Sequence, residues 1–228
     1  MSPPAAAAAV FGAALGTAQE YAGLLTGVAV DRGLIGPAEA ARIWERHLLN
    51  CAVVAELVPR RCELVDLGSG AGLPGIVLAI MRPLAAVTLV EPMARRTVFL
   101  QECADRLELR NVRVRRGRAE DLAGQVGADI VTARAVARLG RLAGLAAGLA
   151  RPGGTVLAIK GASAAAELEQ ARPELLRIGA SGIEILSVGE GLLDQPTTVI
   201  RFTTADRPRG SGAVRGPGVA REPGAARR

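Results

Sequence analysis

The apolar residues divide the chain into a helical N-terminal part and a longer part in which short strands and helices alternate. In residues 37–57, apolar side chains recur at intervals of three and four, which is typical of an amphipathic helix, and residues 17–25 show the same spacing. Pro37 suits the first turn of the longer helix. We therefore expect a helical extension over residues 16–58, preceded by a poorly ordered Ala/Pro-rich segment over residues 1–15.

After residue 58 the apolar residues form short blocks separated by segments of helix length. The blocks that predict strands are residues 63–67, 86–91, 112–115, 129–133, 155–160, 183–188 and 197–203. Strands joined by helical crossovers form a parallel sheet that is covered on both faces, whereas the last two blocks have no helix between them and can pair directly. The pattern predicts a doubly wound, Rossmann-like α/β core with a mostly parallel sheet over residues 59–204. The Pro-, Gly- and Arg-rich residues 205–228 are expected to be a disordered basic tail.

Composition narrows the class of protein. Half of the residues are hydrophobic but only 2% are aromatic, so the core must be aliphatic. No apolar run reaches the roughly 18–20 residues that cross a bilayer, and the N-terminus lacks the basic start of a secretory signal. Cys51, Cys62 and Cys103 are odd in number and form no Cys-x-x-Cys pair, which predicts reduced thiols and neither a disulfide framework nor a zinc site. We expect a cytoplasmic, monomeric protein that uses no membrane and no metal.

The net charge of +6 is concentrated at the C-terminal end. From Asp206 onward, six arginines stand against Asp206 and Glu222, so the rest of the chain carries only about +2. Bulk charge therefore does not by itself predict a nucleic-acid partner. Lys160 is the only lysine and ends a predicted strand. A compact ammonium at that place would suit a phosphate, although chance explains the survival of one lysine among so many arginines equally well.

A glycine-rich loop follows the first predicted strand, where a parallel sheet binds its ligands. It reads Asp66-Leu67-Gly68-Ser69-Gly70-Ala71-Gly72. Glycines let the backbone approach a ligand, and the helix that follows offers unpaired N–H groups. The spacing of Gly70, Gly72 and Gly75 also satisfies the G-x-G-x-x-G dinucleotide fingerprint. The loop alone thus predicts a nucleotide-like cofactor without saying which one, and a tight turn without a ligand stays open.

Acidic residues beside the loop favour S-adenosylmethionine. Asp66 stands at the strand end, where a carboxylate can bind an ammonium group directly or through water, whereas a pyrophosphate would gain nothing from an anion there. Glu91 ends the second predicted strand, where an acceptor can take both ribose hydroxyls. Residues 118–121 (Arg-Ala-Glu-Asp) follow the third predicted strand, where they can contact the amino edge of an adenine. Alternatively, Glu120 is only a favourable negative charge at a helix N-terminus. Because Glu91 suits nicotinamide cofactors equally, a nicotinamide-dependent oxidoreductase remains the enzymatic alternative.

Further motifs carry a closer resemblance over residues 20–203. In chain order they are Arg46-His47-Leu48-Leu49, the loop 66–75 with its Gly-Leu-Pro-Gly end, Arg95-Arg96 with Phe99-Leu100, Arg118-Ala119-Glu120, Ala133-Arg134-Ala135, Arg151-Pro152-Gly153-Gly154 and Lys160-Gly161. The sequence resembles class I S-adenosylmethionine-dependent methyltransferases, and among them the family of 16S ribosomal RNA guanine-N7 methyltransferases, also called glucose-inhibited division protein B. The family often has Asn-Leu-Thr where this chain has residues 24–26 (Leu-Leu-Thr), and a Ser at the place of Ala133. Both departures concern RNA contacts more than the cofactor.

The resemblance implies roles for individual residues. The cofactor is expected to be S-adenosylmethionine and the partner 16S rRNA within the small ribosomal subunit. The residues expected to bind or hold the cofactor are Gly68, Leu73, Ala119, Glu120, Arg134, Asp66, Gly70, Gly72 and Glu91. The residues expected on the RNA side are Arg134, His47, Arg46, Lys160, Arg118, Arg95 and Arg138. A methyltransferase for another RNA or a small molecule, and a non-catalytic RNA-binding module, are the remaining alternatives.

Guanine N7 carries an in-plane lone pair and no proton, so its methylation needs positioning rather than a general base. We expect no catalytic base and assign positioning to Arg134, which can donate to guanine O6 or to a phosphate. An ion pair of Arg134 with Asp66 or Glu120 is an alternative use of the same side chain. His47, the only histidine, is expected to have a structural role or to contact RNA.

Overall fold

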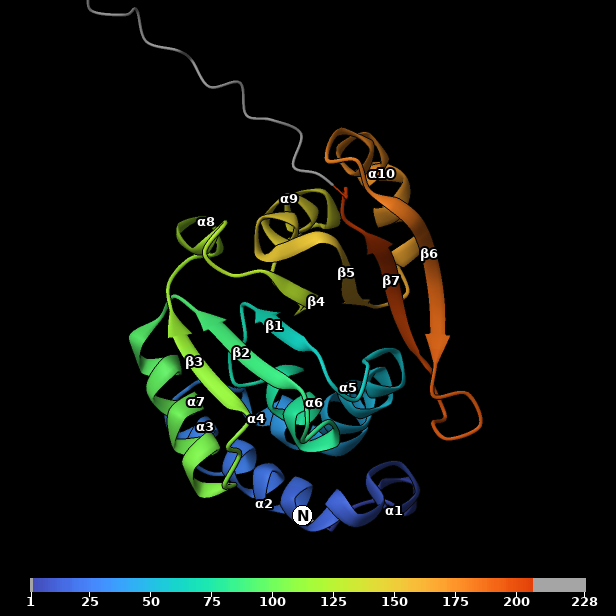
Figure 1. The fold of residues 1–228 in the computed structure, drawn as a ribbon. Helices are drawn as coiled ribbons and strands as arrows, with labels where there is room; N and C mark the ends of the chain where they lie inside the picture. The colour runs from blue at the N-terminus through green and yellow to red at the C-terminus, as the bar shows by residue number, and fades with distance from the viewer. Residues whose placement is uncertain (1, 207–228) are drawn as a thin grey trace, which may run out of the picture.

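A seven-stranded sheet forms the centre of the computed structural model, which describes residues 2–206 (Figure 1). The strand order is β3-β2-β1-β4-β5-β7-β6. The strands are β1 (Glu63–Leu67), β2 (Ala86–Glu91), β3 (Val112–Arg116), β4 (Ala128–Arg134), β5 (Ala150–Lys160), β6 (Ser181–Val188) and β7 (Thr197–Thr203). Strands β1 to β5 run parallel, and β7 runs antiparallel to both β5 and β6. The predicted doubly wound, mostly parallel sheet is confirmed, including the pairing of the last two strands.

The start of β5 differs most from its predicted bounds. The apolar block predicts a strand from residue 155, whereas β5 begins at Ala150 and includes the Arg-Pro-Gly-Gly segment. Its register with β4 shifts between the pair Ala128–Ala150 and the pair Ile130–Thr155. Proline and glycine argue against a strand because they disturb the regular hydrogen bonding between strands. In β5 the shift of register accommodates these residues.

Two aliphatic cores cover the two faces of the sheet because successive strand residues point to opposite sides. Leu64 belongs to one core and Val65 to the other, and Leu89 and Val90 alternate in the same way. The helices on the Leu64 face include α2 (Leu15–Thr26), α5 (Leu49–Ala52), α6 (Gly75–Met81) and α7 (Ala94–Arg106). The helices on the opposite face are α8 (Ala119–Leu122), α9 (Leu139–Leu149) and α10 (Ala164–Arg177) (Figure 1).

The N-terminal segment differs from its prediction. Residues 1–15 are predicted to be poorly ordered, but α1 (Ala5–Phe11) is a helix, followed by a short 3₁₀ turn, η1 (Gly12–Ala14). Phe11 is buried, and its ring packs edge-to-face on Trp44 with centroids 6.1 Å apart. The prediction of disorder is wrong for this helix because composition alone does not show that Phe11 has a distant aromatic partner.

A short helix, α3 (Val28–Asp31), follows α2. The helix predicted over residues 37–57 is not continuous but consists of four short pieces. The pieces are α4 (Pro37–Ala40), a π-helical segment η2 (Ile43–Leu48), α5 and a 3₁₀ segment η3 (Val53–Leu57). Trp44, His47 and Leu48 of the π-helical segment are buried. π-Helical turns in proteins are rare and frequently accompany functional sites. None of the helices in residues 2–206 combines the length and the apolarity that a membrane span requires. The tail prediction from residue 207 onward lies outside the described residues.

Candidate functional site

The strand order reverses between β1 and β4, and a doubly wound sheet binds ligands beyond the carboxyl ends of the strands at such a point. Two cavities lie there. The glycine-loop cavity, about 600 Å³, is lined by residues that include Gly68, Glu91, Arg96, Ala119 and Glu120. The basic cavity, about 960 Å³, is lined by residues that include Arg46, Arg134, Arg138 and Lys160. Residues 135–137, directly after β4, line both cavities. The two cavities therefore adjoin along one short segment.

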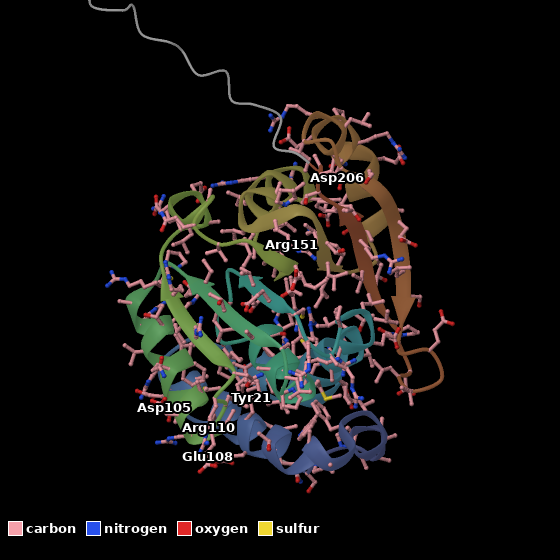
Figure 2. The ribbon with its side chains drawn as sticks, in the orientation of Figure 1. Tyr21, Asp105, Glu108, Arg110, Arg151 and Asp206 are labelled. Carbon is pink, nitrogen blue, oxygen red and sulfur yellow. The ribbon has the colours of Figure 1, made fainter. Side chains whose placement is uncertain are left out.

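Backbone conformation requires glycine at two positions of the loop. Gly68 has φ +69°, and a Cβ there would lie 2.8 Å from Val136 Cγ2. Gly72 has φ +98°, and a Cβ there would lie 2.5 Å from the hydroxyl oxygen of Tyr21. That hydroxyl donates a hydrogen bond of 2.7 Å to the Ala71 carbonyl oxygen. Tyr21, labelled in Figure 2, belongs to α2 and is fully buried. The helical extension thus supports the loop directly.

Asp66 braces the loop from inside. Its side chain is completely buried; Oδ2 accepts a hydrogen bond from the Gly75 N–H at 3.0 Å and Oδ1 one from the Thr132 hydroxyl at 3.2 Å. Burial raises the pKa of Asp66 to about 6. A direct contact between this carboxylate and an ammonium group does not fit the geometry, because no part of Asp66 is accessible. A contact through water stays a prediction. Sequence position alone places Asp66 at the strand end but cannot show that the loop folds over it.

Glu91 connects the loop to the wall of the glycine-loop cavity. It is 2% exposed, and its two oxygens accept hydrogen bonds from the Gly70 and Met93 N–H groups, each at 3.0 Å. Arg96 Nη1 lies 3.6 Å from Glu91 Oε2. Arg96 Nε is buried without a hydrogen-bond partner, although the same guanidinium lines the cavity. A buried donor of this kind is costly unless a ligand or water satisfies it.

The predicted cofactor residues fall into three groups. Gly68, Glu91, Ala119 and Glu120 line the glycine-loop cavity, and Glu120 also lies 3.7 Å from Arg141 in an ion pair. Asp66, Gly70, Gly72 and Leu73 shape or support the loop; Leu73 packs partly buried against the core on the α6 side. Arg134 lies in the basic cavity. The structure brings all nine residues to one edge of the sheet, but only the first group lines the glycine-loop cavity.

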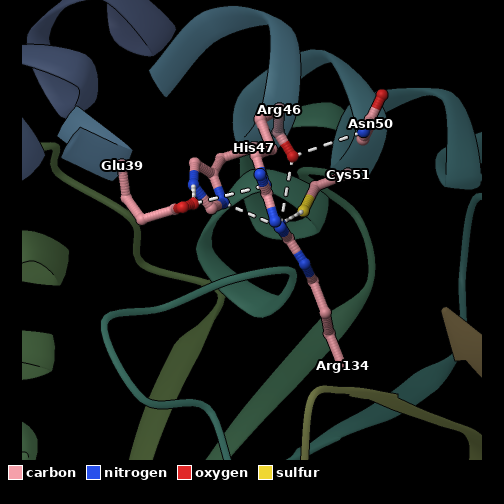
Figure 3. Close-up of polar contacts among 6 residues, drawn as sticks. All are labelled: Glu39, Arg46, His47, Asn50, Cys51 and Arg134. Atoms are coloured by element: carbon pink, nitrogen blue, oxygen red, sulfur yellow. Dashed lines mark hydrogen bonds and ion pairs between the residues drawn. The ribbon is translucent and has the colours of Figure 1, made fainter. Parts of the chain in front are cut away.

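Arg134 is held by the N-terminal extension (Figure 3). Its Nη2 donates to His47 Nδ1 at 2.7 Å and to the Arg46 carbonyl oxygen at 3.1 Å, and its Nη1 donates to Cys51 Sγ at 3.4 Å. Within residues 2–206 it forms no ion pair with Asp66 or Glu120, so that alternative is wrong. The carboxylates are engaged elsewhere, and the guanidinium reaches across to η2 and α5 instead.

His47 lies behind Arg134. It is 9% exposed, and its Nε2 lies 2.7 Å from Glu39 Oε2. Burial, followed by the charge of Arg134, lowers the pKa of His47 below its usual 6.5. The predicted structural role of His47 agrees with these contacts.

The other predicted RNA-side residues differ in accessibility. Lys160 Nζ donates to Glu167 Oε2 at 2.8 Å and to the Ala137 carbonyl oxygen at 3.2 Å, and its side chain is only 9% exposed. Arg46 and Arg138 are exposed at the basic cavity. Arg118 is exposed at the glycine-loop cavity, and Arg95 is exposed on α7. A phosphate contact of Lys160 stays a prediction, and it would have to share the ammonium with Glu167.

Sequence reasoning missed Tyr21 and Glu39, and it named Ala135 of the segment 135–137 only as part of a motif. Tyr21 acts through a contact with Ala71, 50 residues away, for which a single sequence carries no signal. Glu39 bonds His47, only 8 residues away, but the regular helix predicted there would place the two residues about two turns apart. The segment 135–137 could have been found, because it directly follows a strand at the ligand-binding edge. Among residues 2–206, no three His, Cys, Asp or Glu side chains gather into a group that could hold a metal ion.

Comparison with known structures agrees with the fold. A SAM-dependent O-methyltransferase from Thermotoga maritima superposes with a TM-score of 0.56 at 12% identity, covering 70% of this chain and 66% of the other. TYW2 from P. horikoshii, in complex with MeSAdo, superposes with a TM-score of 0.54 at 14% identity, covering 71% and 63% of the two chains. The chain therefore has the Rossmann-like fold of these methyltransferases.

Comparison of sequences is more specific. The family model for GidB, rRNA small subunit methyltransferase G, matches residues 15–193. The chain is 58% identical to the ribosomal RNA small subunit methyltransferase G of Thermobifida fusca over 201 residues, which cover 88% of this chain and 85% of the relative. It is 50% identical to the protein of the same name from Arthrobacter sp. over 196 residues, covering 86% and 91% of the two chains. The chain belongs to the rRNA small subunit methyltransferase G family.

Proposed function

We propose that this enzyme transfers a methyl group from S-adenosylmethionine to N7 of a guanine in the 16S rRNA of the small ribosomal subunit. The donor would occupy the glycine-loop cavity and the guanine the basic cavity. One observation carries the proposal: the two cavities adjoin at residues 135–137, so a small donor in one and a base in the other would meet across that segment.

The glycine-loop cavity has the chemical groups that an adenosyl donor requires. Leu67, Val90 and Leu145 give it apolar walls for a planar base, and Glu91 gives it an acceptor for ribose hydroxyls. Arg96, whose side chain is 34% exposed, adds a positively charged donor to the cavity wall. A volume of about 600 Å³ lies within the range of small-molecule sites. When bound there, S-adenosylmethionine supplies an electrophilic methyl group on a sulfonium centre.

The basic cavity suits a guanine and its phosphates. The hydrogen bonds of Arg134 to His47, Arg46 and Cys51 use three of its five N–H donors, so two remain for the guanine O6 or a phosphate. Arg46 and Arg138 add exposed positive charge. Since N7 has no proton, these groups need only orient the base and stabilise the charge that develops during transfer.

Ligand binding and methyl transfer test the proposal in sequence. Calorimetry should show binding of S-adenosylmethionine, with NADH binding far more weakly or not at all. The loaded enzyme should then pass labelled methyl to the RNA of isolated small ribosomal subunits. Tight binding of NADH with no binding of S-adenosylmethionine, or binding of RNA without any transfer of label, would refute the assignment.

A further inference from the structure

Glu39, His47 and Arg134 form a continuous chain of hydrogen bonds from α4 through η2 to the end of β4 (Figure 3). Glu39 Oε2 lies 2.7 Å from His47 Nε2, and His47 Nδ1 lies 2.7 Å from Arg134 Nη2. The sequence separations are 8 and 87 residues, so the chain of bonds joins the extension to the central sheet. It ends at the edge of the basic cavity.

The chemistry of the three groups fixes the position of the imidazole proton. A guanidinium can only donate, so His47 Nδ1 must accept the Arg134 hydrogen bond and cannot carry a proton. The proton of the neutral ring therefore lies on Nε2, where it is donated to Glu39. Glu39 thus stabilises the one tautomer that can accept from Arg134.

The same contacts restrict Arg134. Nη2 is held by two acceptors, His47 Nδ1 and the Arg46 carbonyl, and Nη1 contacts Cys51 Sγ. An arginine side chain has large rotamer freedom, which these three contacts remove before any ligand binds. A preorganised donor is worth more in a transition state than one that must be ordered during the reaction.

We propose that Glu39 and His47 are positioning residues: Glu39 selects the Nε2–H tautomer of His47, and His47 thereby holds the Arg134 guanidinium in place for the guanine. This inference rests on the proposed function, because it takes Arg134 as the residue that faces the base. It gives the lone histidine a role that is neither general base nor RNA contact. It also gives Glu39, outside the sheet, a part in the reaction.

The positioning chain predicts a pH dependence of definite sign. The charged groups that face His47 are Glu39 from α4, Arg46 from η2 and Arg134 from β4. Protonation of His47 would place a proton on Nδ1 and remove the acceptor for Arg134. Activity should therefore fall as the pH drops through the pKa of His47, which lies below the usual 6.5. Above that pKa the orienting effect of His47 should be fully present.

Nuclear magnetic resonance of the ring nitrogens tests the tautomer without any assay of methyl transfer. Because the chain has a single histidine, the spectrum of ¹⁵N-histidine-labelled protein reports His47 alone. At neutral pH, Nε2 should be protonated and Nδ1 unprotonated. Glu39→Ala should yield a mixture of tautomers, and Arg134→Ala should raise the pKa of His47 because it removes a nearby positive charge. A protonated Nδ1 in the wild-type protein would overturn the proposal.

Kinetics with small ribosomal subunits test the effect on Arg134. Glu39→Ala should lower kcat/KM about tenfold, the loss expected for one orienting hydrogen bond, while Glu39→Gln retains most activity because its amide oxygen can still accept from Nε2–H. Glu56→Ala, an exposed glutamate of the same extension, is the matched control. Circular dichroism and thermal melting confirm that each variant is folded.

A double-mutant cycle distinguishes positioning from general support of the fold. If Glu39 acts through Arg134, then Glu39→Ala should add little further loss in an Arg134→Ala background. Fully additive losses would overturn the proposal, as would a Glu39→Gln variant as impaired as Glu39→Ala. If the wild-type enzyme transfers no methyl group at all, the proposed function fails, while the tautomer and the His47 pKa still test the positioning chain.

Discussion

At the scale of single residues, the glycine loop depends on two buried carboxylates that bond its backbone. Asp66 accepts a hydrogen bond from the Gly75 N–H and Glu91 accepts one from the Gly70 N–H, so the loop backbone is held at two positions. Neither role is visible in the sequence, which places both acids correctly at strand ends but suggests ligand contacts for them. In the structure, Glu91 lines the glycine-loop cavity, whereas Asp66 is fully buried.

Asp66 should make the stability of the protein depend on pH. Its folded-state pKa, about 6, lies above the unfolded value of 3.8, so its neutral form is favoured in the folded protein. The stability that protonated Asp66 provides is thus fully present below the unfolded pKa and is lost as the pH rises through the folded pKa, by up to roughly 3 kcal/mol. In Asp66→Asn this loss is absent, so the variant should gain stability relative to the wild type as the pH rises across this window. Urea unfolding at several pH values measures the difference; a difference independent of pH would contradict the assignment.

Gly68 should be essential for the shape of the loop rather than for the fold. Gly68→Ala would place a Cβ at φ +69° and 2.8 Å from Val136 Cγ2. We expect binding of S-adenosylmethionine to weaken by at least about tenfold, because strain of roughly 1–2 kcal/mol adds to the steric contact. Gly124→Ala is the matched control, since Gly124 has φ +73° but no atom within 4 Å of the Cβ that the substitution adds. Equal losses of affinity in both variants would show a general effect of a strained alanine and would contradict a specific role of Gly68 in the shape of the loop.

At the scale of elements, the N-terminal extension is part of the site rather than an accessory to it. Tyr21 of α2 bonds the loop at Ala71, and η2 and α5 hold Arg134 at the end of β4. The periodicity of residues 37–57 predicts the buried face of this region correctly, but it does not predict the π-helical turn that includes His47.

Tyr21→Phe should separate loop support from core packing. Phenylalanine keeps the buried ring but loses the hydrogen bond to the Ala71 carbonyl, so unfolding free energy should fall by about 1 kcal/mol. Affinity for S-adenosylmethionine should fall several-fold as the loop loses its support. The control is Thr26→Ala, which removes a hydrogen bond within the same helix at Ala22 and does not reach the loop. If calorimetry finds unchanged affinity in Tyr21→Phe, the extension does not position the loop.

The elements that the sequence predicts best are those with local signals. The strands follow from short apolar blocks, and the loop follows from glycines at a strand end. What could not be predicted depends on distant partners: Phe11 packs on Trp44, and Arg134 bonds His47 across 87 residues. Hydrogen bonds of this kind are selected by the folded geometry, so the ion pair considered as an alternative for Arg134 is chemically reasonable and still wrong.

At the scale of the whole molecule, the positive charge is small in total but is concentrated at one cavity. The chain carries +6 in total, of which the residues before Asp206 account for only about +2. Arg46, Arg134 and Arg138 nevertheless gather at one cavity, whereas the adjoining cavity is lined by both acidic and basic side chains, namely Glu91, Glu120, Arg96, Arg118 and Arg141. The more basic of the two adjoining cavities suits an anionic polymer.

Arg138→Ala should therefore affect the RNA side alone. The KM for small ribosomal subunits should rise about tenfold or less, the dependence on salt should weaken, and affinity for S-adenosylmethionine should stay unchanged. Arg113→Ala, an exposed arginine on β3, serves as the control for lost charge. An equal rise in KM in both variants would indicate a diffuse electrostatic contribution instead of a specific contact.

The most direct test of the proposed function is the chemical identity of the methylated nucleoside. Small ribosomal subunits are incubated with the enzyme and labelled S-adenosylmethionine, and the 16S rRNA is then digested to nucleosides and also cleaved chemically at 7-methylguanine. We predict that the label co-migrates with 7-methylguanosine and that strand scission occurs at a single position. Label on another atom or another base, or no label in the RNA, would contradict the proposed function.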